Sequence, residues 1–344
     1  MKRKGRARSG VSFLVFSLVL LLVALWLGAA IGETAIPLDV VAKTVANRVW
    51  NAGYALEPID EGIVWSYRLS RAVIAACCGA SLAISGVILQ SLLRNSLADP
   101  YILGISAGAS TGGAVGVAIL GIGAGVLSLS LGAFIGAIVA FCLVSLLALR
   151  AGRGSSAIIL AGIAGSQLFN ALTSFIVTKA ANAEQARGIM FWLLGNLSGV
   201  RWPDVILALP ACLVGLAICL WHSRALDAFT FGTESAASLG IPVRRVYAVL
   251  IGVSAMMTAV MVSIVGSVGF IGLVIPPHAA RMVVGVRHGR LLPAAALIGA
   301  IFMIVADILS RIIIPGQVLP IGVITALFGA PAFALLLGQR RASS

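Results

Sequence analysis

Long apolar runs, interrupted by charged residues, prolines and glycines, dominate the pattern of hydrophobic and polar positions along this chain. A helix needs about 20 mostly apolar residues to cross the ~30 Å hydrocarbon core of a bilayer. Ten runs of about this length lie at residues 11–32, 68–92, 101–121, 124–149, 156–179, 203–221, 246–266, 269–285, 292–312 and 320–338. These runs are too long for the strands of a membrane barrel, and helices satisfy their own backbone hydrogen bonds in lipid. The pattern therefore predicts an all-α, polytopic membrane protein with about ten transmembrane helices.

Composition supports the bilayer as the solvent of this chain. It is 60% hydrophobic and 10% charged, whereas a soluble domain has about 25% charged residues. The longest polar segment runs only from Gly32 to Tyr67, so we expect residues 1–344 to form a single membrane domain. Within that segment Leu38, Val41, Val45 and Val49 have helical spacing. This spacing is compatible with a short helix on the membrane surface or with a simple connector.

Charge predicts the orientation. The first run follows a basic start, as in a signal peptide. It is, however, longer than the apolar part of a signal sequence, and no clear cleavage site follows it. We therefore interpret it as a retained span behind a tail of residues 1–10. An even number of spans places both termini on one side. Most of the 24 lysines and arginines then share that side, and most of the 11 acids lie on the other. The positive-inside rule makes the termini cytoplasmic, and the net charge of +13 reflects topology rather than nucleic-acid binding.

Small residues mark places of close packing. Gly104, Gly108, Gly112 and Gly116 recur at every fourth position, a pattern that lets membrane helices approach closely. The same glycine face is also compatible with the border of a translocation path. The cysteines, at positions 77, 78, 142, 212 and 219, all lie in predicted spans without C-x-x-C spacing, and we expect them to pack as small apolar residues.

Candidate chemistry is sparse. The sequence contains no G-x-x-x-x-G-K-[ST] phosphate-binding loop, so an ATPase acting here must be another chain. Asp307 is the only acid well inside a span and lies four residues before Arg311, which predicts an ion pair, either structural or part of a substrate site. The histidines at 222, 278 and 288 form no metal-binding pattern. An ion-coupled secondary transporter is disfavoured by the scarcity of buried acids, and a membrane-embedded enzyme by the lack of a Ser/His/Asp, metal or paired-carboxylate pattern.

Four ordered segments resemble the iron-siderophore, haem and cobalamin importer permeases of the ABC class. The first contains R-L-S-R and L-L-R-N-S-L-A-D-P-Y-I-L-G-I-S-A-G-A, within residues 68–109. The second is M-F-W-L-L-G-N-L-S-G, at 190–199, and the third is F-G-T-E-S-A-A-S-L-G-I-P-V, at 231–243. The fourth begins with G-S-V-G-F-I-G-L-V-I-P-P-H-A-A-R, at 266–281, and continues through L-P-I-G-V-I-T-A-L-F-G-A-P-A-F to residue 333. The chain departs from the family pattern at Pro276–Pro277, where a single proline is usual, and at Val318, where an acid is frequent.

The resemblance implies a bacterial cytoplasmic-membrane permease that pairs with itself or with a paralogous permease. Two separate ATP-binding subunits would hold ATP and Mg, an extracytoplasmic binding protein would deliver the substrate, and this chain would hold no cofactor, metal or nucleic acid. We expect the substrate to be an iron chelate, most simply a ferric siderophore, with cobalamin and haem as alternatives.

The resemblance also implies roles for particular residues. Arg68, Arg71 and Arg311 match arginines that meet acidic residues of the binding protein, although long basic side chains also lie at membrane interfaces without a partner. Near the dimer axis, Gly266, Gly269 and Gly272 leave the backbone free to bend, which predicts either a gate or a tight turn.

Residues 224–243 are the expected cytoplasmic coupling segment. Thr233 is a candidate helix cap, and Gly240 with Pro242 predicts the end of that helix. The resemblance implies that Glu234, Leu239 and Gly240 belong to the ATPase contact, and we expect Thr233 and Ser235 of the same segment to take part in it. A helix lying on the membrane surface is the alternative.

Overall fold

The computed structural model describes residues 2–120, 125–152, 155–180, 183–273 and 275–341. Its regular elements are helices, and these residues form no strand, which confirms the all-α class. Seven helical segments are long and apolar enough to cross a membrane. They are α1 (Lys2–Ala30), a continuous segment made of α3 (Pro58–Gly62), a π-helix (Ile63–Leu69) and α4 (Ser70–Leu92), then α6 (Gly125–Ala151), α7 (Ser155–Ala180), α9 (Trp202–Trp221), α12 (Val243–Val265) and α14 (His288–Ile312).

Three further predicted spans take other forms. A 3₁₀ turn (Pro100–Leu103) and Gly104, with φ of 74°, precede α5 (Ile105–Leu120), and α15 (Ile321–Arg341) closes the fold. The prediction of a full eighth crossing at 269–285 is wrong. The helix there, α13 (Ile275–Val284), has ten residues and so spans only about 15 Å, half of the hydrocarbon core.

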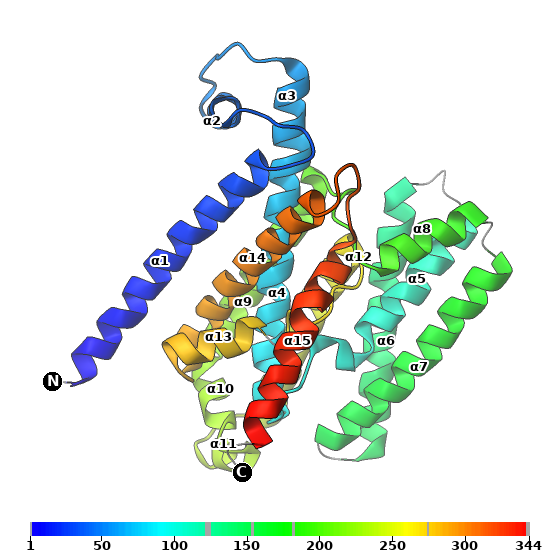
Figure 1. Ribbon diagram of the computed structural model, residues 1–344. Helices are drawn as coiled ribbons and strands as arrows, with labels where there is room; N and C mark the ends of the chain where they lie inside the picture. The colour runs from blue at the N-terminus through cyan, green and yellow to red at the C-terminus, as the bar shows by residue number, and fades with distance from the viewer. Residues whose placement is uncertain (1, 121–124, 153–154, 181–182, 274, 342–344) are drawn as a thin grey trace.

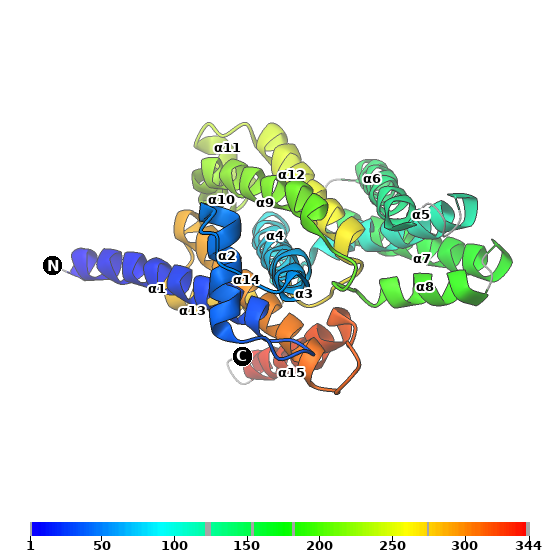
Figure 2. The ribbon, with the colours of Figure 1, turned by 90° about the horizontal axis from the view of Figure 1, so that it is seen from above.

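Helix α4 lies at the centre of the molecule. Viewed from above, α9, α12 and α14 surround it, α5 to α8 form a group at one side, and α1 lies at the opposite edge (Figure 2). The most apolar stretch of α4 is almost entirely buried, whereas only a minor part of that of α1 is buried, as expected of an edge helix that faces lipid. The core thus forms around α4.

Of the two alternatives for the spacing of Leu38 to Val49, the helix is the one present, as α2 (Leu38–Trp50), which lies across the top of the bundle in Figure 1. Val41 of α2 is buried, and Arg48 of α2 forms an ion pair with Glu61 of α3 at 2.8 Å. On its open side, the hydrogen bond from Lys43 lowers the pKa of Asp39. We call this side of the molecule the α2 end.

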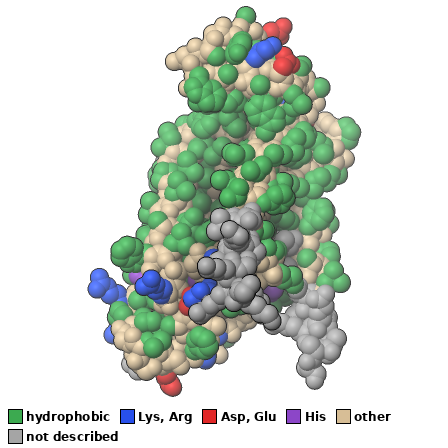
Figure 3. All heavy atoms as spheres, turned by 90° about the vertical axis from the view of Figure 1, so that its left-hand side faces the viewer, with side chains coloured by type: hydrophobic (Ala, Val, Ile, Leu, Met, Phe, Trp, Pro, Cys, Tyr) green, Lys and Arg blue, Asp and Glu red, His purple; other side chains and the backbone are tan. Residues whose placement is uncertain are grey.

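The opposite side, the α11 end, carries two short helices between α9 and α12. These are α10 (Ser223–Phe229) and α11 (Thr233–Ser238). On the face shown in Figure 3, charged side chains gather near both ends, and apolar side chains cover the surface between them. This is the surface expected of a chain whose middle is solvated by lipid.

The glycine repeat serves helix packing, as predicted. A Cβ added at Gly112 would lie 2.1 Å from the carbonyl oxygen of Gly132 on α6, and one at Gly108 would lie 2.4 Å from that of Gly136. Four of the cysteines are free and buried, as expected of packing residues, whereas Cys142 is exposed. An additional helix, α8 (Ala183–Leu193), lies within the connection between α7 and α9.

Candidate functional site

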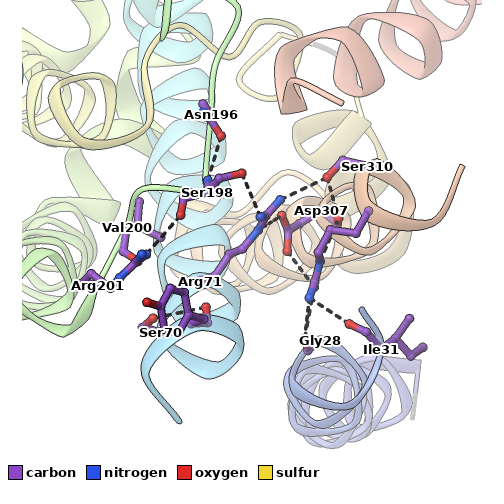
Figure 4. Close-up of polar contacts among 12 residues, drawn as sticks. Gly28, Ile31, Ser70, Arg71, Asn196, Ser198, Val200, Arg201, Asp307 and Ser310 are labelled. Carbon is purple, nitrogen blue, oxygen red and sulfur yellow. Dashed lines mark hydrogen bonds and ion pairs between the residues drawn. The ribbon is translucent and has the colours of Figure 1, made fainter. Parts of the chain in front are cut away.

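A buried ionic cluster joins α4 and α14 at the α2 end. The Asp307 carboxylate has no exposed surface and accepts a hydrogen bond from Nε of Arg71 at 2.6 Å. Its other oxygen lies 2.8 Å from Nη2 of Arg311, which confirms the ion pair predicted from the spacing. Arg71 also donates to the hydroxyls of Ser198 and Ser310, at 3.2 and 3.3 Å (Figure 4).

The same cluster holds the end of α1. Arg311 donates to the carbonyl oxygens of Gly28 and Ile31 at 2.8–3.1 Å, and Arg68 donates to those of Ala30 and Thr34. The last carbonyls of a helix have no partner within the helix and carry the negative end of its dipole. Two guanidinium groups thus cap α1 and fix it to the bundle.

This geometry bears on the predicted docking residues. Arg68, Arg71 and Arg311 are only 6%, 8% and 5% exposed, and each guanidinium is bonded within the chain. In this conformation the three guanidinium groups are engaged inside the chain, and withdrawing Arg71 or Arg311 would weaken the compensation of the buried Asp307 carboxylate. Their docking role stays a prediction, and the role that the contacts establish is internal.

A non-helical stretch, residues 266–273, separates α12 from α13 inside the bundle. Its backbone enters the left-handed region at Gly266, with φ of 81°, and at Phe270, with φ of 69°. Positive φ is rare and strained for a bulky residue, and such positions concentrate at ligand sites and switches.

Side chains from other helices replace the missing helical hydrogen bonds of this stretch. The Tyr101 hydroxyl donates to the carbonyl oxygen of Val268 and accepts from its N–H, at 3.0 and 2.9 Å. The Gln90 amide donates to the carbonyl oxygens of Gly272 and Leu273, at 3.3 and 3.1 Å. Irregular backbone at membrane depth is tolerated only when protein satisfies it in this way.

The three predicted gate glycines have different surroundings. A Cβ at Gly266 would lie 2.2 Å from the Trp192 carbonyl oxygen, and one at Gly272 would lie 2.7 Å from Pro100, so both allow close approach. A Cβ at Gly269 would meet nothing within 4 Å. The stretch is therefore a supported, non-helical segment that includes a turn at residues 271–273, and its movement as a gate remains a prediction.

The expected coupling segment has an anchored half and an exposed half. Leu226 and Phe229 of α10 are buried, and the Phe229 ring packs edge-on against Tyr247 of α12 at 6.4 Å. In α11, only Ala236 is buried, and Leu239 just beyond it is 71% exposed. The segment thus presents a free apolar surface at the α11 end.

The ends of α11 differ in part from the prediction. Thr233 is not the N-cap, because Gly232 occupies that position and no side chain caps the first turn. Gly232 has φ of 109°, a conformation that favours glycine. The predicted C-terminal end is confirmed. Gly240 has φ of 77°, its N–H donates to the Ala237 carbonyl at 2.9 Å, and that of Ile241 donates to Ala236. Glu234 and Ser235 are exposed, as a contact surface requires.

The sequence pattern did not predict one group of polar side chains. The His288 ring lies 2.7 Å from the Asp227 carboxylate through Nδ1 and 2.7 Å from the Ser91 hydroxyl through Nε2. This is the Ser/His/Asp arrangement that the sequence pattern did not suggest, because the three residues are far apart along the chain and no local motif marks them. The His288 residue is 3% exposed, and the group joins α4, α10 and α14. Among the described residues, no cluster of ligands could hold a metal ion.

Comparison with known proteins identifies the family of this bundle. The sequence profile of the FecCD transport family matches residues 20–339. The chain belongs to the FecCD transport family. It is 41% identical to the cobalamin import system permease protein BtuC of Halobacterium salinarum, over 81% of this chain and 74% of that protein. It is 37% identical to the Fe(3+) dicitrate transport system permease protein FecD of Escherichia coli, over 85% of this chain and 89% of that protein.

A solved structure shares the fold. It is described as an inward-facing conformation of a metal-chelate type ABC transporter, and it matches 95% of this chain and 99% of its own with a TM-score of 0.83 and 29% identity. As a member of the FecCD family, the chain is a multi-pass permease subunit of an ABC importer. In this family the ATPase is a separate subunit, and a substrate-binding protein is a partner.

Proposed function

We propose that this permease moves an iron chelate, most simply a ferric siderophore, across the bacterial cytoplasmic membrane. The proposal is supported by the similarity of 85% of this chain to an iron dicitrate permease and by its likeness to the fold of a metal-chelate type transporter. Cobalamin is the second candidate, favoured by the 41% identity to an archaeal cobalamin permease. Substrate choice would rest mainly with the binding protein.

The substrate test uses the permease with its ATPase and binding protein in proteoliposomes. Uptake is measured for a panel of ferric siderophores, haem and cobalamin, at equal concentrations. The proposal expects ATP-dependent uptake of at least one ferric siderophore, with lower uptake of cobalamin and haem. Uptake of cobalamin alone would replace the proposed substrate, and uptake of none would reject the substrate class.

We further propose that the α11 end is cytoplasmic, that two copies of the chain form the permease, and that two ATPase subunits hold ATP and Mg beneath it. The excess of basic residues expected on this side supports the orientation. The coupling segment then faces the ATPases. Exposed Leu239, next to the turn at Gly240, would enter a groove on the ATPase.

The coupling contact is tested with Leu239→Asp and Gly240→Leu. Leu239 is exposed and a Cβ at Gly240 meets nothing within 4 Å, so neither change disturbs buried packing, although Gly240→Leu strains a backbone that favours glycine. We expect both variants to fold and to lose ATPase co-purification or to hydrolyse ATP without uptake. The matched control is Leu38→Asp at the α2 end, where the side chain is 59% exposed. If the α11 variants and the control couple like the wild type, the segment is not the ATPase contact.

A further inference from the structure

Helices α4 and α14 run side by side in opposite directions and are joined at both ends. At the α2 end, Arg71 in the first turn of α4 pairs with Asp307 near the end of α14. At the α11 end, Ser91 in the last turn of α4 meets His288, the first residue of α14. Two polar contacts about 20 residues apart on each helix hold the same pair at opposite sides of the bundle.

Backbone contact joins the two helices between these ends. A Cβ at Gly79 of α4 would lie 2.0 Å from the Gly299 carbonyl oxygen of α14, and one at Gly299 would lie 2.3 Å from that of Gly79. Such close packing leaves little room for one helix to slide past the other. The α4–α14 pair is thus a stiff unit about 35 Å long, given the 23 residues of α4.

The α11 end of this unit is tied to the coupling segment through Asp227 of α10. One oxygen of its carboxylate accepts two hydrogen bonds from His288, from the backbone N–H at 2.8 Å and from Nδ1 at 2.7 Å. A carboxylate only accepts, so Nδ1 carries the hydrogen of this bond. The backbone N–H belongs to the free first turn of α14, so Asp227 caps α14 from another helix.

The unit also meets the non-helical stretch that is the candidate gate. A Cβ at Gly86 of α4 would lie 1.9 Å from the Gly272 carbonyl oxygen, and Gln90, one residue before Ser91, donates to that same carbonyl at 3.3 Å. The coupling segment, the α4–α14 pair and the stretch 266–273 are therefore in direct sequential contact.

We propose that the Asp227–His288–Ser91 relay transmits displacement of the coupling segment to the α4–α14 pair, and through it to residues 266–273. Asp227, His288 and Ser91 are positioning residues in this scheme. The inference rests on the proposed contact between the coupling segment and the ATPase. It adds the internal path by which that contact reaches the membrane interior. Charge-assisted hydrogen bonds suit this role because they are short and directional.

The test removes the two links of the relay separately. Asp227→Ala deletes the carboxylate, Ser91→Ala deletes the α4 link, and Asp227→Asn keeps an oxygen that can accept both bonds from His288. In the complex with the ATPase, we expect substrate imported per ATP hydrolysed to fall roughly fivefold in Ser91→Ala, which loses one hydrogen bond to His288, and by roughly tenfold or more in Asp227→Ala, which loses two charge-assisted ones. Asp227→Asn should restore most of the coupling.

A matched control separates this role from simple stability. The hydroxyls of Ser91 and Ser174 both donate to the carbonyl four residues earlier, at 2.8 and 3.0 Å, but Ser174 lies exposed on α7, away from His288. Ser174→Ala should couple like the wild type. Thermal unfolding of each variant identifies any loss of coupling that follows only from unfolding.

A second readout does not depend on the substrate. Spin labels at exposed Ser238 and Leu97 report the distance between α11 and the end of α4 in the ATPase complex. We expect one narrow distance distribution in the wild type and in Asp227→Asn, and a broad one in Asp227→Ala. Unchanged distributions and unchanged coupling in both alanine variants would overturn the relay. Failure of the wild type to import any chelate would instead overturn the proposed substrate, while the distances still decide the relay.

Discussion

Asp307→Asn is the substitution that most sharply tests the ionic cluster at the α2 end. Asparagine has the shape of aspartate but no charge, so packing is retained and only the counter-ion of two arginines is lost. Asp307 is fully buried and lies 2.6 and 2.8 Å from Arg71 and Arg311. Breaking a buried ion pair from one side costs about 3–5 kcal/mol, because a charge is left uncompensated.

The expected effect is a large loss of stability. For a protein of this size, a loss of that magnitude lowers Tm by roughly 4–7 °C. The assay is thermal unfolding of the purified permease in one detergent, followed by fluorescence-detected gel filtration. Because Arg311 also holds α1, we expect protease sensitivity near Gly28 and Ile31 to rise in the same variant.

Asp39→Asn is the matched control, since Asp39 also forms an ion pair with a basic residue four positions later, Lys43, at 2.8 Å. Both side chains of that pair are exposed to water, which screens them. Its Tm should equal that of the wild type. An unchanged Tm in Asp307→Asn would refute the reasoning that the buried carboxylate compensates the arginines.

Three further predictions concern packing, the helix break and orientation. Gly112→Ala places a Cβ 2.1 Å from a backbone oxygen of α6 and should greatly reduce the yield of folded permease. Gly252→Ala, whose Cβ would meet nothing within 4 Å, should not reduce that yield. Equal yields of the two variants would contradict the close packing of α5 against α6. Tyr101→Phe leaves the Val268 N–H and carbonyl without their partner, at a cost of about 1–3 kcal/mol. A cysteine introduced at Val268 should therefore react faster with maleimide in the Tyr101→Phe variant than in the chain that keeps Tyr101. Equal rates would show that the Tyr101 hydroxyl does not hold the stretch. In intact cells a membrane-impermeant maleimide should label Asn51→Cys but not Ser238→Cys, and the reverse pattern would invert the proposed orientation.

Much of the fold was predictable because a bilayer imposes a length on every crossing helix. The limits of α7, α9 and α14 lie within a few residues of the apolar runs that predicted them. The prediction of a crossing helix at 269–285 failed because the residues of this region are mostly apolar in both its non-helical and its helical part, so hydropathy does not separate the two. Its non-helical backbone is supported by Gln90 and Tyr101, more than 160 positions away, and no local pattern shows such support.

The site residues show the same division. The pair Asp307–Arg311 followed from helical spacing, and the turn at Gly240 followed from a glycine two residues before a proline. The role of Arg311 in capping α1 could not be predicted in this way, because its acceptor at Gly28 lies 283 positions earlier. Arginine near a helix end has the same sequence pattern whether it faces a partner or a neighbouring helix. Only the tertiary arrangement distinguishes the two.

The central claim is that this chain converts ATP hydrolysis by a partner into chelate import through α11. It is tested most directly by measuring ATP hydrolysis and ferric siderophore uptake in the same proteoliposomes, for the wild type and Leu239→Asp. The account predicts that wild-type uptake requires both the ATPase and the binding protein, and that Leu239→Asp abolishes uptake while the permease stays folded. Uptake by Leu239→Asp at the wild-type ratio to ATP hydrolysed, or wild-type uptake without ATP, would contradict it.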